Sequence, residues 1–421
     1  MIKQDKYIIR GGKALYGTIK VQTSKNAALP ILAASLMSGG TVEINDYPHI
    51  SDLDNMLKIL KGIKVDIVKT DTKLILNPSE ADNVHMNFEL MKTMRSSIFL
   101  LGSMLARFKT ATITQPGGCK IGARPIDIHL KGLKKMGVKI CELGEEIFFD
   151  ASAAHNANIK LDLPSVGATE NLVQFACLTK GKTVLTNVAR EPEIVDLCNF
   201  LISMGARIYG AGTNKITILG VDELKSTQYT PISDRIVAGT YMIATAICGG
   251  KVRLNNVDAN QNLNLIKKLK QIGCQIEIEN DIITITSEKP LKSCGQICTG
   301  YYPDFPTDLQ SQMLVLACFV NGVTDITENL FENRFLIVPE LQKMKATISL
   351  INSKNARVVG VGGKLQAADV KAYDLRGGAA LVLAGLGTNG VSTVHNVFFM
   401  DRGYENFEQN LASLGANIKR L

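Results

Sequence analysis

The sequence predicts a two-domain α/β protein built from six copies of one structural unit. Three observations support this fold class: a helix-ending turn that recurs along the chain, an alternation of helices and strands between these turns, and the length. The chain has 421 residues, of which 46% are hydrophobic and 20% charged. A chain of this length and composition is globular and divides into more than one domain.

The recurring turn has the pattern Gly-x-x-Ile or Gly-x-x-Val. It begins at residues 62, 137, 205, 273, 345 and 415, so successive copies lie 68 to 75 residues apart. Glycine suits the left-handed position that closes a helix, and the following Ile or Val favours a strand. The copy at 345 begins with Lys instead of Gly, so we expect a strained or different cap there. Repetition at this period predicts packed supersecondary units.

Each copy shows the same order of elements. An apolar helix comes first, as expected over 239–247, and a strand follows a short Gly turn, as over 250–254. An amphipathic helix is next, as over 263–272, and further strands complete the unit. The apolar residues of that second helix recur at every third position and share one face: Leu263, Ile266, Leu269 and Ile272. Helices alternating with strands at this spacing predict an α/β fold.

A polar stretch, Ser226 to Pro231, divides the six copies into two groups of three. We therefore expect a linker there, with a domain of three units on each side that face each other across a cleft. Repetition alone leaves open whether the units form only a scaffold or also a functional site, because a fold does not determine a function.

Charge and aromatic content narrow the classes of partner. Lys and Arg number 47 and Asp and Glu 39, a formal net charge of +8, which suits anionic small substrates as well as nucleic acid. Aromatic residues are only 6%, Trp is absent, and no block of Lys or Arg stands out. Platforms for stacking bases are therefore poorly supported, and we expect no nucleic-acid partner.

Hydropathy and cysteine content predict a cytoplasmic protein without a membrane partner. The longest apolar stretch, 98–106, is about half the length of a membrane span, and residues 1–12 lack the apolar core of a signal peptide. Nine cysteines, an odd number, fit a reducing compartment better than a disulfide framework. Cys294 and Cys298 are close in sequence but lack other ligands at suitable spacing, so we expect no metal site.

The segment 115–125, QPGGCKIGARP, is the strongest local signal for chemistry. Its glycines and flanking prolines predict a loop that carries Cys119. Lys120 and Arg124 would favour a nucleophilic thiolate if they point at the sulfur, whereas a thiol that acts as an acid must stay protonated. Both alternatives remain open at this point. Four other cysteines lie in apolar helical runs and are expected to be buried and inert: Cys177, Cys198, Cys248 and Cys318.

Four further positions could bind anions or move protons, and each also has a plainer explanation. The segment 24–26, SKN, precedes an apolar helix whose N-terminus could bind phosphate, or could simply be capped beside a solvated lysine. Asp308 begins the helix expected over 309–320 and could be only its cap. Arg334 and Arg402 are isolated arginines of the kind that often form surface salt bridges.

Nine short segments, taken together, carry a family resemblance. They are Lys25–Pro30, Lys92–Arg95, Gly117–Pro125, Ser165–Glu170, Ala189–Val195, Phe305–Asp308, Phe331–Phe335, Asp374–Arg376 and Asp401–Glu405. In this order, and over essentially the whole chain, they resemble the UDP-N-acetylglucosamine 1-carboxyvinyltransferases, a family of enolpyruvyl transferases.

The resemblance implies the inside-out α/β barrel of the enolpyruvyl transferase fold, with two domains of three packed units each. It also places the first segment of the chain with the C-terminal half. The expected domains are thus 22–229, and 1–21 plus 230–421. Helix N-termini from both domains would point at two phosphate-bearing substrates.

The implied reaction transfers the enolpyruvyl group of phosphoenolpyruvate to the 3-hydroxyl of UDP-N-acetylglucosamine with release of phosphate, the first committed step of peptidoglycan synthesis. By resemblance, Cys119 is the acid, can hold a covalent adduct, and is the target of fosfomycin, while Asp308 takes the hydroxyl proton. Lys25, Arg124 and Arg402 would hold phosphoenolpyruvate, and no metal or organic cofactor is implied. The residues implied at the nucleotide-sugar site, which also includes Lys25 and Asp308, are Asn26, Arg95, Arg124, Pro125, Ile126, Asp127, Ile128, Ser165, Val166, Gly167 and Leu330.

Two alternative functions are consistent with many of the same sequence segments. The related transferase that acts on shikimate phosphate lacks the cysteine loop, so Cys119 argues against it. A catalytically silent paralogue that binds nucleotide sugar is disfavoured because Lys25, Cys119 and Asp308 are all present. The chain departs from the family at Val237, where Glu is usual, and at the pair 377–378, GG, where Ala and a small residue are usual. We expect these departures to loosen the local structure without removing a chemical group.

Overall fold

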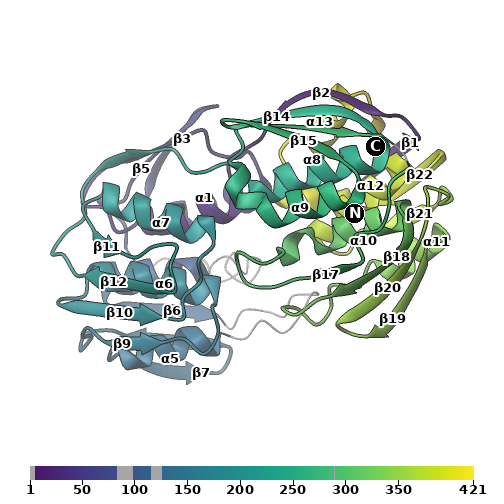
Figure 1. The fold of residues 1–421 in the computed structure, drawn as a ribbon. Helices are drawn as coiled ribbons and strands as arrows, with labels where there is room; N and C mark the ends of the chain where they lie inside the picture. Colours follow the sequence, from purple (N-terminus) through teal and green to yellow (C-terminus); the bar gives the residue numbers. More distant parts are fainter. Residues whose placement is uncertain (1–4, 83–97, 115–125, 289) are drawn as a thin grey trace. The chain divides into compact units, whose positions relative to one another are not determined.

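The computed structural model describes residues 5–82, 98–114, 126–288 and 290–421 (Figure 1). These residues form two compact units, each with three β-sheets. We call the described residues 23–82, 98–114 and 126–232 the N-terminal unit, and residues 5–22 and 233–421 the C-terminal unit. Helices and strands alternate in both, which confirms the predicted α/β class.

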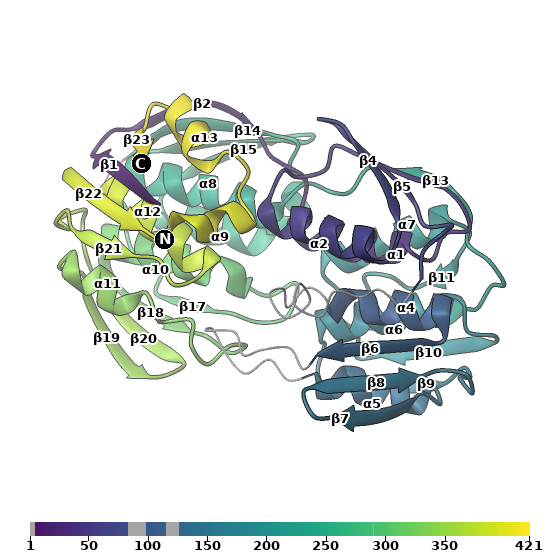
Figure 2. The same cartoon turned by 180° about the vertical axis from the view of Figure 1, so that it is seen from behind.

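The N-terminal unit contains three sheets and six α-helices among its described residues (Figure 2). The sheets, in strand order, are β13 (Thr227–Tyr229), β3 (Val42–Asn45), β5 (Lys73–Asn77) and β4 (Asp66–Lys69); β6 (Thr110–Thr114), β8 (Glu146–Asp150) and β7 (Lys139–Leu143); and β11 (Arg207–Tyr209), β12 (Lys215–Leu219), β10 (Lys182–Thr186) and β9 (Asn158–Lys160). The helices are α1 (Lys25–Ser35), α2 (Ser51–Gly62), α4 (Leu100–Phe108), α5 (Asp127–Lys135), α6 (Val166–Cys177) and α7 (Pro192–Ser203).

The C-terminal unit repeats this plan. Its sheets are β15 (Gln275–Glu279), β16 (Ile282–Ser287), β14 (Gly250–Asn255) and β2 (Leu15–Lys20); β17 (Gln296–Cys298), β18 (Asn321–Thr327), β20 (Asn355–Val361) and β19 (Thr347–Asn352); and β21 (Asp369–Lys371), β22 (Gly390–His395), β1 (Lys6–Gly11) and β23 (Asn417–Arg420). Its α-helices are α8 (Arg235–Cys248), α9 (Leu263–Ile272), α10 (Gln310–Phe319), α11 (Val338–Lys343), α12 (Leu375–Gly387) and α13 (Phe407–Ser413). The short 3-10 helices are η2 (Ala259–Asn262), η3 (Thr307–Leu309) and η4 (Val397–Arg402).

The first helix of each repeat is predominantly apolar and lies inside its unit. In the C-terminal unit, α8, α10 and α12 contact one another, and every residue of α10 and α12 is buried. A helix that is apolar on all faces is stable only when neighbours cover all of it. The sheets therefore cover a helical centre, the inside-out arrangement that the resemblance implied, and each unit has its own hydrophobic core.

The second helix of each repeat is amphipathic and ends at a left-handed residue. In α9 the buried face consists of Leu265, Ile266, Leu269 and Ile272. Leu263, which the three-residue spacing assigned to this face, is 58% exposed, so that assignment was wrong. The face of a 3.6-residue helix drifts away from a strict three-residue spacing, which explains the difference.

The helix-ending turns correct one expectation and confirm another. Gly62 is the last residue of α2, and the left-handed position is two residues later at Lys64, with φ 63°. Lys345 has φ 64°, so the fifth repeat ends in a left-handed cap that is strained for a lysine, as expected. The other copies have glycine at positive φ, as predicted: Gly137, Gly205, Gly273 and Gly415.

Part of the expected linker is a strand. Thr227–Tyr229 forms β13, which pairs in parallel with β3 of the N-terminal unit. The chain passes between the units after residue 22 and after residue 232. At these points the Ser24 amide donates to the Ile232 carbonyl, and the Asp234 amide donates to the Gln22 carbonyl, both at 2.8 Å. Among the described residues, no helix is both long enough and apolar enough to cross a membrane.

Candidate active site

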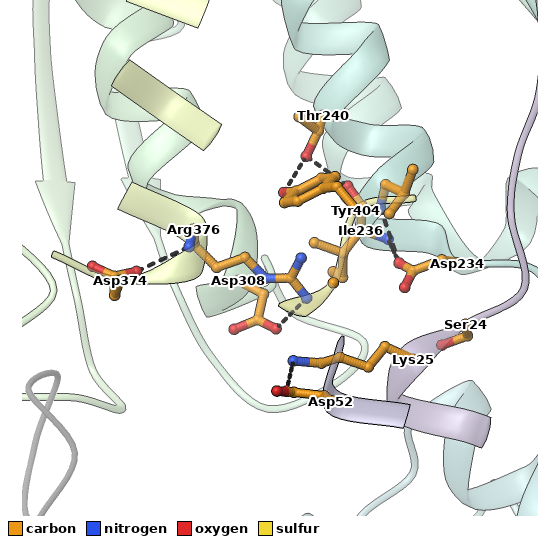
Figure 3. Close-up of polar contacts among 12 residues, drawn as sticks. Ser24, Lys25, Asp52, Asp234, Ile236, Thr240, Asp308, Asp374, Arg376 and Tyr404 are labelled. Atoms are coloured by element: carbon orange, nitrogen blue, oxygen red, sulfur yellow. Dashed lines mark hydrogen bonds and ion pairs between the residues drawn. The ribbon is translucent and has the colours of Figure 1, made fainter. Parts of the chain in front are cut away.

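The predicted site residues that the structure describes form two groups, one in each unit, and we describe each group by itself. In the C-terminal unit, Asp308 lies in η3, just before α10. Its Oδ1 accepts a hydrogen bond from Arg334 Nη2 at 2.6 Å, and its Oδ2 accepts one from Arg376 Nη2 at 3.1 Å (Figure 3 shows the Arg376 side). Neither η3 nor α10 has a side-chain cap, so the interpretation of Asp308 as a cap was wrong.

The two arginines around Asp308 are more deeply buried than the carboxylate. The side chains of Arg334 and Arg376 are 3% and 4% exposed, whereas that of Asp308 is 24% exposed. Burial alone would lower the pKa of Arg376, but Asp308, Tyr404 and Asp234 favour its charge and raise that pKa overall. Two guanidinium groups thus bond both oxygens of a carboxylate that stays partly open to solvent, which fixes the orientation of this carboxylate.

A hydrogen-bonded group supports Arg376 from within the unit. The guanidinium of Arg376 lies over the ring of Tyr404, 5.5 Å from its centroid. The Tyr404 hydroxyl is 3.0 Å from Thr240 Oγ1 of α8, and Gln312 Nε2 of α10 donates to it at 3.2 Å. Asp374 accepts from the backbone amide of Arg376 at 2.9 Å and caps α12. These contacts hold the backbone of Arg376 at one end and its guanidinium at the other.

Glu328 holds the backbone around two of the predicted site residues. This residue is fully buried, and its carboxylate accepts from the backbone amides of Leu330 at 2.9 Å and Phe331 at 3.1 Å. It also accepts from the hydroxyl of Thr307, the neighbour of Asp308, at 3.0 Å. Leu330, predicted to contact the nucleotide sugar, therefore belongs to the same local structure as Asp308.

Arg402 ends η4, and its side chain is exposed. Its neighbour Asp401 forms an ion pair with Arg420 at 2.6 Å. Two of the positions that depart from the family are closely packed in this unit, and the loosening expected of them stays a prediction. Val237 is 1% exposed, and a Cβ on Gly378 would lie 2.4 Å from Met400 Sδ. The small residue thus permits close packing of η4 against α12.

In the N-terminal unit, Lys25 is the first residue of α1. Ser24 caps this helix by accepting from the Ala27 amide at 3.4 Å, as predicted. Lys25 Nζ donates to Asp52 Oδ2 at 3.3 Å, and the two side chains are 13% and 5% exposed (Figure 3). The interpretation of Lys25 as a solvated lysine was therefore wrong, because it is largely buried and paired. Asn26 follows it and is half-buried.

The N-terminus of α6 carries three more predicted residues. Ser165 caps this helix by accepting from the Ala168 amide at 3.3 Å, and half-buried Val166 and Gly167 form its first turn. A Cβ on Gly167 would lie 3.2 Å from His129 Cε1 of α5, so glycine permits α5 and α6 to approach closely. The serine cap leaves the remaining free amides and the positive end of the helix dipole available for an anion.

The start of α5 carries the remaining predicted residues of this unit. Ile126 and Ile128 are half-buried, and Asp127 is exposed and lies 3.6 Å from Lys131 in an i, i+4 ion pair. Asn171 of α6 fixes α5 by donating to His129 Nδ1 at 3.0 Å. The predicted residues of α5 and α6 therefore lie on two helices that are packed together.

Four predicted site residues lie outside the described residues: Arg95, Cys119, Arg124 and Pro125. The sequence named Arg334 as a candidate but not its contact with Asp308, and sequence reasoning missed the supporting roles of Arg376, Glu328 and Asp52. Arg334 and Arg376 lie in two segments that carry the resemblance, and those segments were the available signal. Nothing in the sequence pattern around Glu328 or Asp52 pointed to the site.

Comparison of the chain with known proteins identifies its family. The EPSP synthase (3-phosphoshikimate 1-carboxyvinyltransferase) family matches residues 9–411. The UDP-N-acetylglucosamine 1-carboxyvinyltransferase 2 of Caldanaerobacter subterraneus subsp. tengcongensis is 46% identical over 416 residues, 99% of each chain. The protein of the same name from Carboxydothermus hydrogenoformans is 45% identical over 421 residues, again 99% of each chain.

Solved structures show the same fold at low identity. The enolpyruvyl transferase NikO from Streptomyces tendae has a TM-score of 0.90 at 22% identity, covering 99% of each chain. EPSP synthase from Acinetobacter baumannii has a TM-score of 0.75 at 20% identity, covering 100% of each chain. These likenesses confirm the predicted enolpyruvyl transferase fold. Together with the match over residues 9–411 and relatives of such identity over nearly the full length, they show that the chain belongs to the EPSP synthase (3-phosphoshikimate 1-carboxyvinyltransferase) family.

Proposed function

We propose that the protein transfers the enolpyruvyl group of phosphoenolpyruvate to the 3-hydroxyl of UDP-N-acetylglucosamine and releases phosphate, the first committed step of peptidoglycan synthesis. The observation that carries this proposal is Asp308, a carboxylate at the start of a helix that it does not cap. Both of its oxygens accept from buried arginines, and this fixed orientation supports a role for the carboxylate in the reaction.

Asp308 is the base in this proposal. The sugar hydroxyl must lose its proton as its oxygen attacks C2 of phosphoenolpyruvate, and a positioned carboxylate accepts that proton. The hydrogen bonds from Arg334 and Arg376 fix the orientation of the carboxylate before the substrate binds. Such preorganisation lowers the cost of reaching the transition state.

Cys119 is the proposed acid. Its thiol gives a proton to the methylene carbon of phosphoenolpyruvate, a C–H bond forms, and C2 becomes an electrophile that the sugar oxygen attacks. The resulting tetrahedral adduct returns a methyl proton to the Cys119 thiolate and expels phosphate as the C–O bond to phosphate breaks, which restores the double bond and the thiol. Asp308 and Cys119 thus perform opposite proton transfers, as this addition and elimination requires.

Cations and helix N-termini supply the binding energy for two anionic substrates. We assign Lys25, Arg124 and Arg402 to phosphoenolpyruvate, and Arg95 with residues 124–128 to the nucleotide sugar. The serine-capped N-termini of α1 and α6, with Asn26 and residues 165–167, suit the same ligand because their caps add no negative charge. Leu330 contributes a half-buried apolar contact. The proposed steps need no metal or organic cofactor.

The names of the relatives favour UDP-N-acetylglucosamine over shikimate phosphate as the acceptor. Several proteins with the name UDP-N-acetylglucosamine 1-carboxyvinyltransferase are 42–46% identical to this chain over nearly its full length. The EPSP synthase from Acinetobacter baumannii is only 20% identical. We also place the reaction in the cytoplasm, since the described cysteines are free thiols, a state that reducing compartments maintain.

An assay of phosphate release tests the proposal. Phosphoenolpyruvate is incubated with the protein, with and without UDP-N-acetylglucosamine, and the sugar product is analysed by mass spectrometry. We expect phosphate only when both substrates are present, in equal amount to an enolpyruvyl ether of the nucleotide sugar. Binding of UDP-N-acetylglucosamine without any phosphate release would instead identify a silent paralogue and contradict the proposal.

A further inference from the structure

Arg420, in the last strand of the chain, joins two carboxylates that are distant in sequence. Its Nη1 and Nη2 donate to Asp401 Oδ1 and Oδ2 at 2.7 and 2.6 Å. Its Nε donates to Asp5 Oδ1 at 2.9 Å, and Nη2 also bonds Asp5 Oδ2. The guanidinium further lies over the ring of Tyr7, 5.8 Å from the centroid. We call Arg420, Asp401 and Asp5 the terminal anchor.

The terminal anchor holds the short helix that carries Arg402. Asp401 is the residue before Arg402 in η4. The first residue of η4, Val397, donates its amide to the carbonyl of Asp5 at 3.3 Å. Met400 of η4 is fully buried against α12. The helix is therefore fixed at its beginning by the Asp5 backbone, in its middle by Met400, and at its end by Arg420.

The terminal anchor has the two-pronged geometry that makes some ion pairs stronger than ordinary surface pairs. Surface ion pairs usually contribute little, but two-pronged contacts between arginine and carboxylate are the exception. Arg420 is 30% exposed and Asp5 21%, so water screens the contacts only in part. Hydrogen bonds to Asp401 and Asp5 raise the pKa of Arg420, which therefore stays charged. Without Arg420, the two carboxylates would face each other without a cation between them.

We propose that Arg420 is a positioning residue that orders η4 and thereby places Arg402 for the anionic substrate phosphoenolpyruvate. This inference rests on the function proposed above. The amides of Gly403 and Tyr404 close the end of η4 by donating to the Met400 carbonyl at 3.0 and 2.9 Å. Because the internal hydrogen bonds of a 3-10 helix are weak, the side-chain contacts of Arg420 with Asp401 add to the order of this end. Fixing the helix in advance removes the cost of ordering it when the substrate binds. Loss of the anchor should then weaken phosphoenolpyruvate binding more than it affects the chemical steps.

The test compares Arg420→Gln with Arg357→Gln. Arg357 makes a two-pronged pair with Asp325 at 2.8 and 3.0 Å in β18 and β20, and it serves as the control for losing such a contact elsewhere in the same unit. We expect Arg420→Gln to raise KM for phosphoenolpyruvate roughly 10-fold, the effect of losing one hydrogen bond to a charged group. KM for UDP-N-acetylglucosamine and kcat at saturating phosphoenolpyruvate should change less than about 3-fold. Arg357→Gln should leave all three constants unchanged.

Two further variants separate positioning from general stability. Asp401→Asn should raise KM for phosphoenolpyruvate like Arg420→Gln, and the double variant should add little because both remove the same contact. Arg420→Lys should be intermediate, since lysine cannot bond both carboxylates with a planar fork. Melting temperatures are measured in parallel, and all rates are taken well below them.

Several results would overturn the inference. An unchanged KM for phosphoenolpyruvate in Arg420→Gln, with only a lower melting temperature, would make the anchor purely structural. An equal rise in both KM values would indicate general disorder, and an Arg402→Lys variant with normal KM values would remove the residue that the anchor is supposed to place. Failure of the proposed function is distinguishable from all of these, because the unmodified protein would then release no phosphate with UDP-N-acetylglucosamine.

Discussion

Asp308 shows how a single residue can be mistaken for a helix cap. Asp234 and Asp374 cap α8 and α12 by accepting backbone amides, and Asp308 occurs in a similar sequence setting before α10. Its carboxylate instead bonds Arg334 and Arg376. The helix loses a cap, and the site gains an oriented carboxylate with 24% of its side chain open to solvent.

Asp308→Asn tests this role. The amide cannot accept the substrate proton, so we expect kcat to fall about 100- to 10,000-fold. The two buried guanidinium groups also lose their negative partner, so the free energy of unfolding should fall by roughly 1–3 kcal/mol. Asp325→Asn, which loses an exposed ion pair, is the control and should keep full activity. An Asp308→Asn enzyme with normal kcat would show that another group is the base.

Glu170 carries a carboxyl group in the interior of the N-terminal unit, where burial disfavours its charged form. It is 1% exposed, its Oε2 has no hydrogen-bond partner among the described residues, and burial together with Glu193 and Glu191 raises its pKa well above the ordinary value. The folded protein therefore keeps this proton at pH values where the unfolded chain, with a pKa of about 4.3, has lost it. The protonated side chain of Glu170 therefore makes its full contribution to stability at pH values below the pKa of the unfolded chain. This contribution is lost as the pH rises through the pKa of Glu170 in the folded protein.

Glu170→Gln should remove this pH dependence. We expect the variant to gain stability relative to the unmodified protein at pH 8 but much less at pH 5. Each kcal/mol corresponds to about 2–4 °C in melting temperature for a unit of this size. Thermal melts of both proteins across this pH range provide the measurement. A melting difference that is the same at both pH values would show that Glu170 is ionised in the folded protein.

At the scale of the elements, the six helix-ending turns show what the sequence predicts well. A left-handed turn after an amphipathic helix is a local feature, and the glycines at 137, 205, 273 and 415 were assigned correctly. The left-handed residue after α2 was predicted two residues too early, because a glycine, Gly62, was expected at a position that Lys64 occupies instead. Lys345 adopts the same conformation as the glycines, at a cost of roughly 1–2 kcal/mol for an L-residue.

Lys345→Gly should therefore stabilise the C-terminal unit. Glycine relieves the left-handed strain but loses more backbone entropy on folding, so the net gain should be about 0.5–1 kcal/mol. The matched opposite change is Gly205→Ala, where an added Cβ meets nothing within 4 Å and only backbone strain acts. We expect it to destabilise by about 1 kcal/mol. Denaturant unfolding of both variants measures the two effects, and shifts in the same direction would contradict this account of the caps.

The partners of the site residues could not be predicted from the sequence. Arg334 and Arg376 are 26 and 68 residues from Asp308, and only the packing of α10 and α12 together with the turn after β18 brings them near it. Lys25 likewise meets Asp52 on the next helix. Periodicity and turn residues report local structure, whereas these ion pairs depend on tertiary packing. The candidate residues themselves were identified by resemblance and not by such contacts.

For the whole molecule, the repeats explain both the fold and its connections. Each unit has three sheets around apolar helices among its described residues. The strand before α1 pairs within the C-terminal unit, as β2 with β14, and the strand before α8 pairs within the N-terminal unit, as β13 with β3. Each unit thus completes one of its sheets with a strand that precedes the other unit's helix.

The choice of acceptor tests the central claim most directly. Phosphate release from phosphoenolpyruvate is measured with either UDP-N-acetylglucosamine or 3-phosphoshikimate as the second substrate, under identical conditions. If the protein acts as proposed, kcat/KM for UDP-N-acetylglucosamine exceeds that for 3-phosphoshikimate by at least roughly 10,000-fold, as for a site that must pair its polar groups with the correct ligand. Equal or faster turnover with 3-phosphoshikimate would contradict the account.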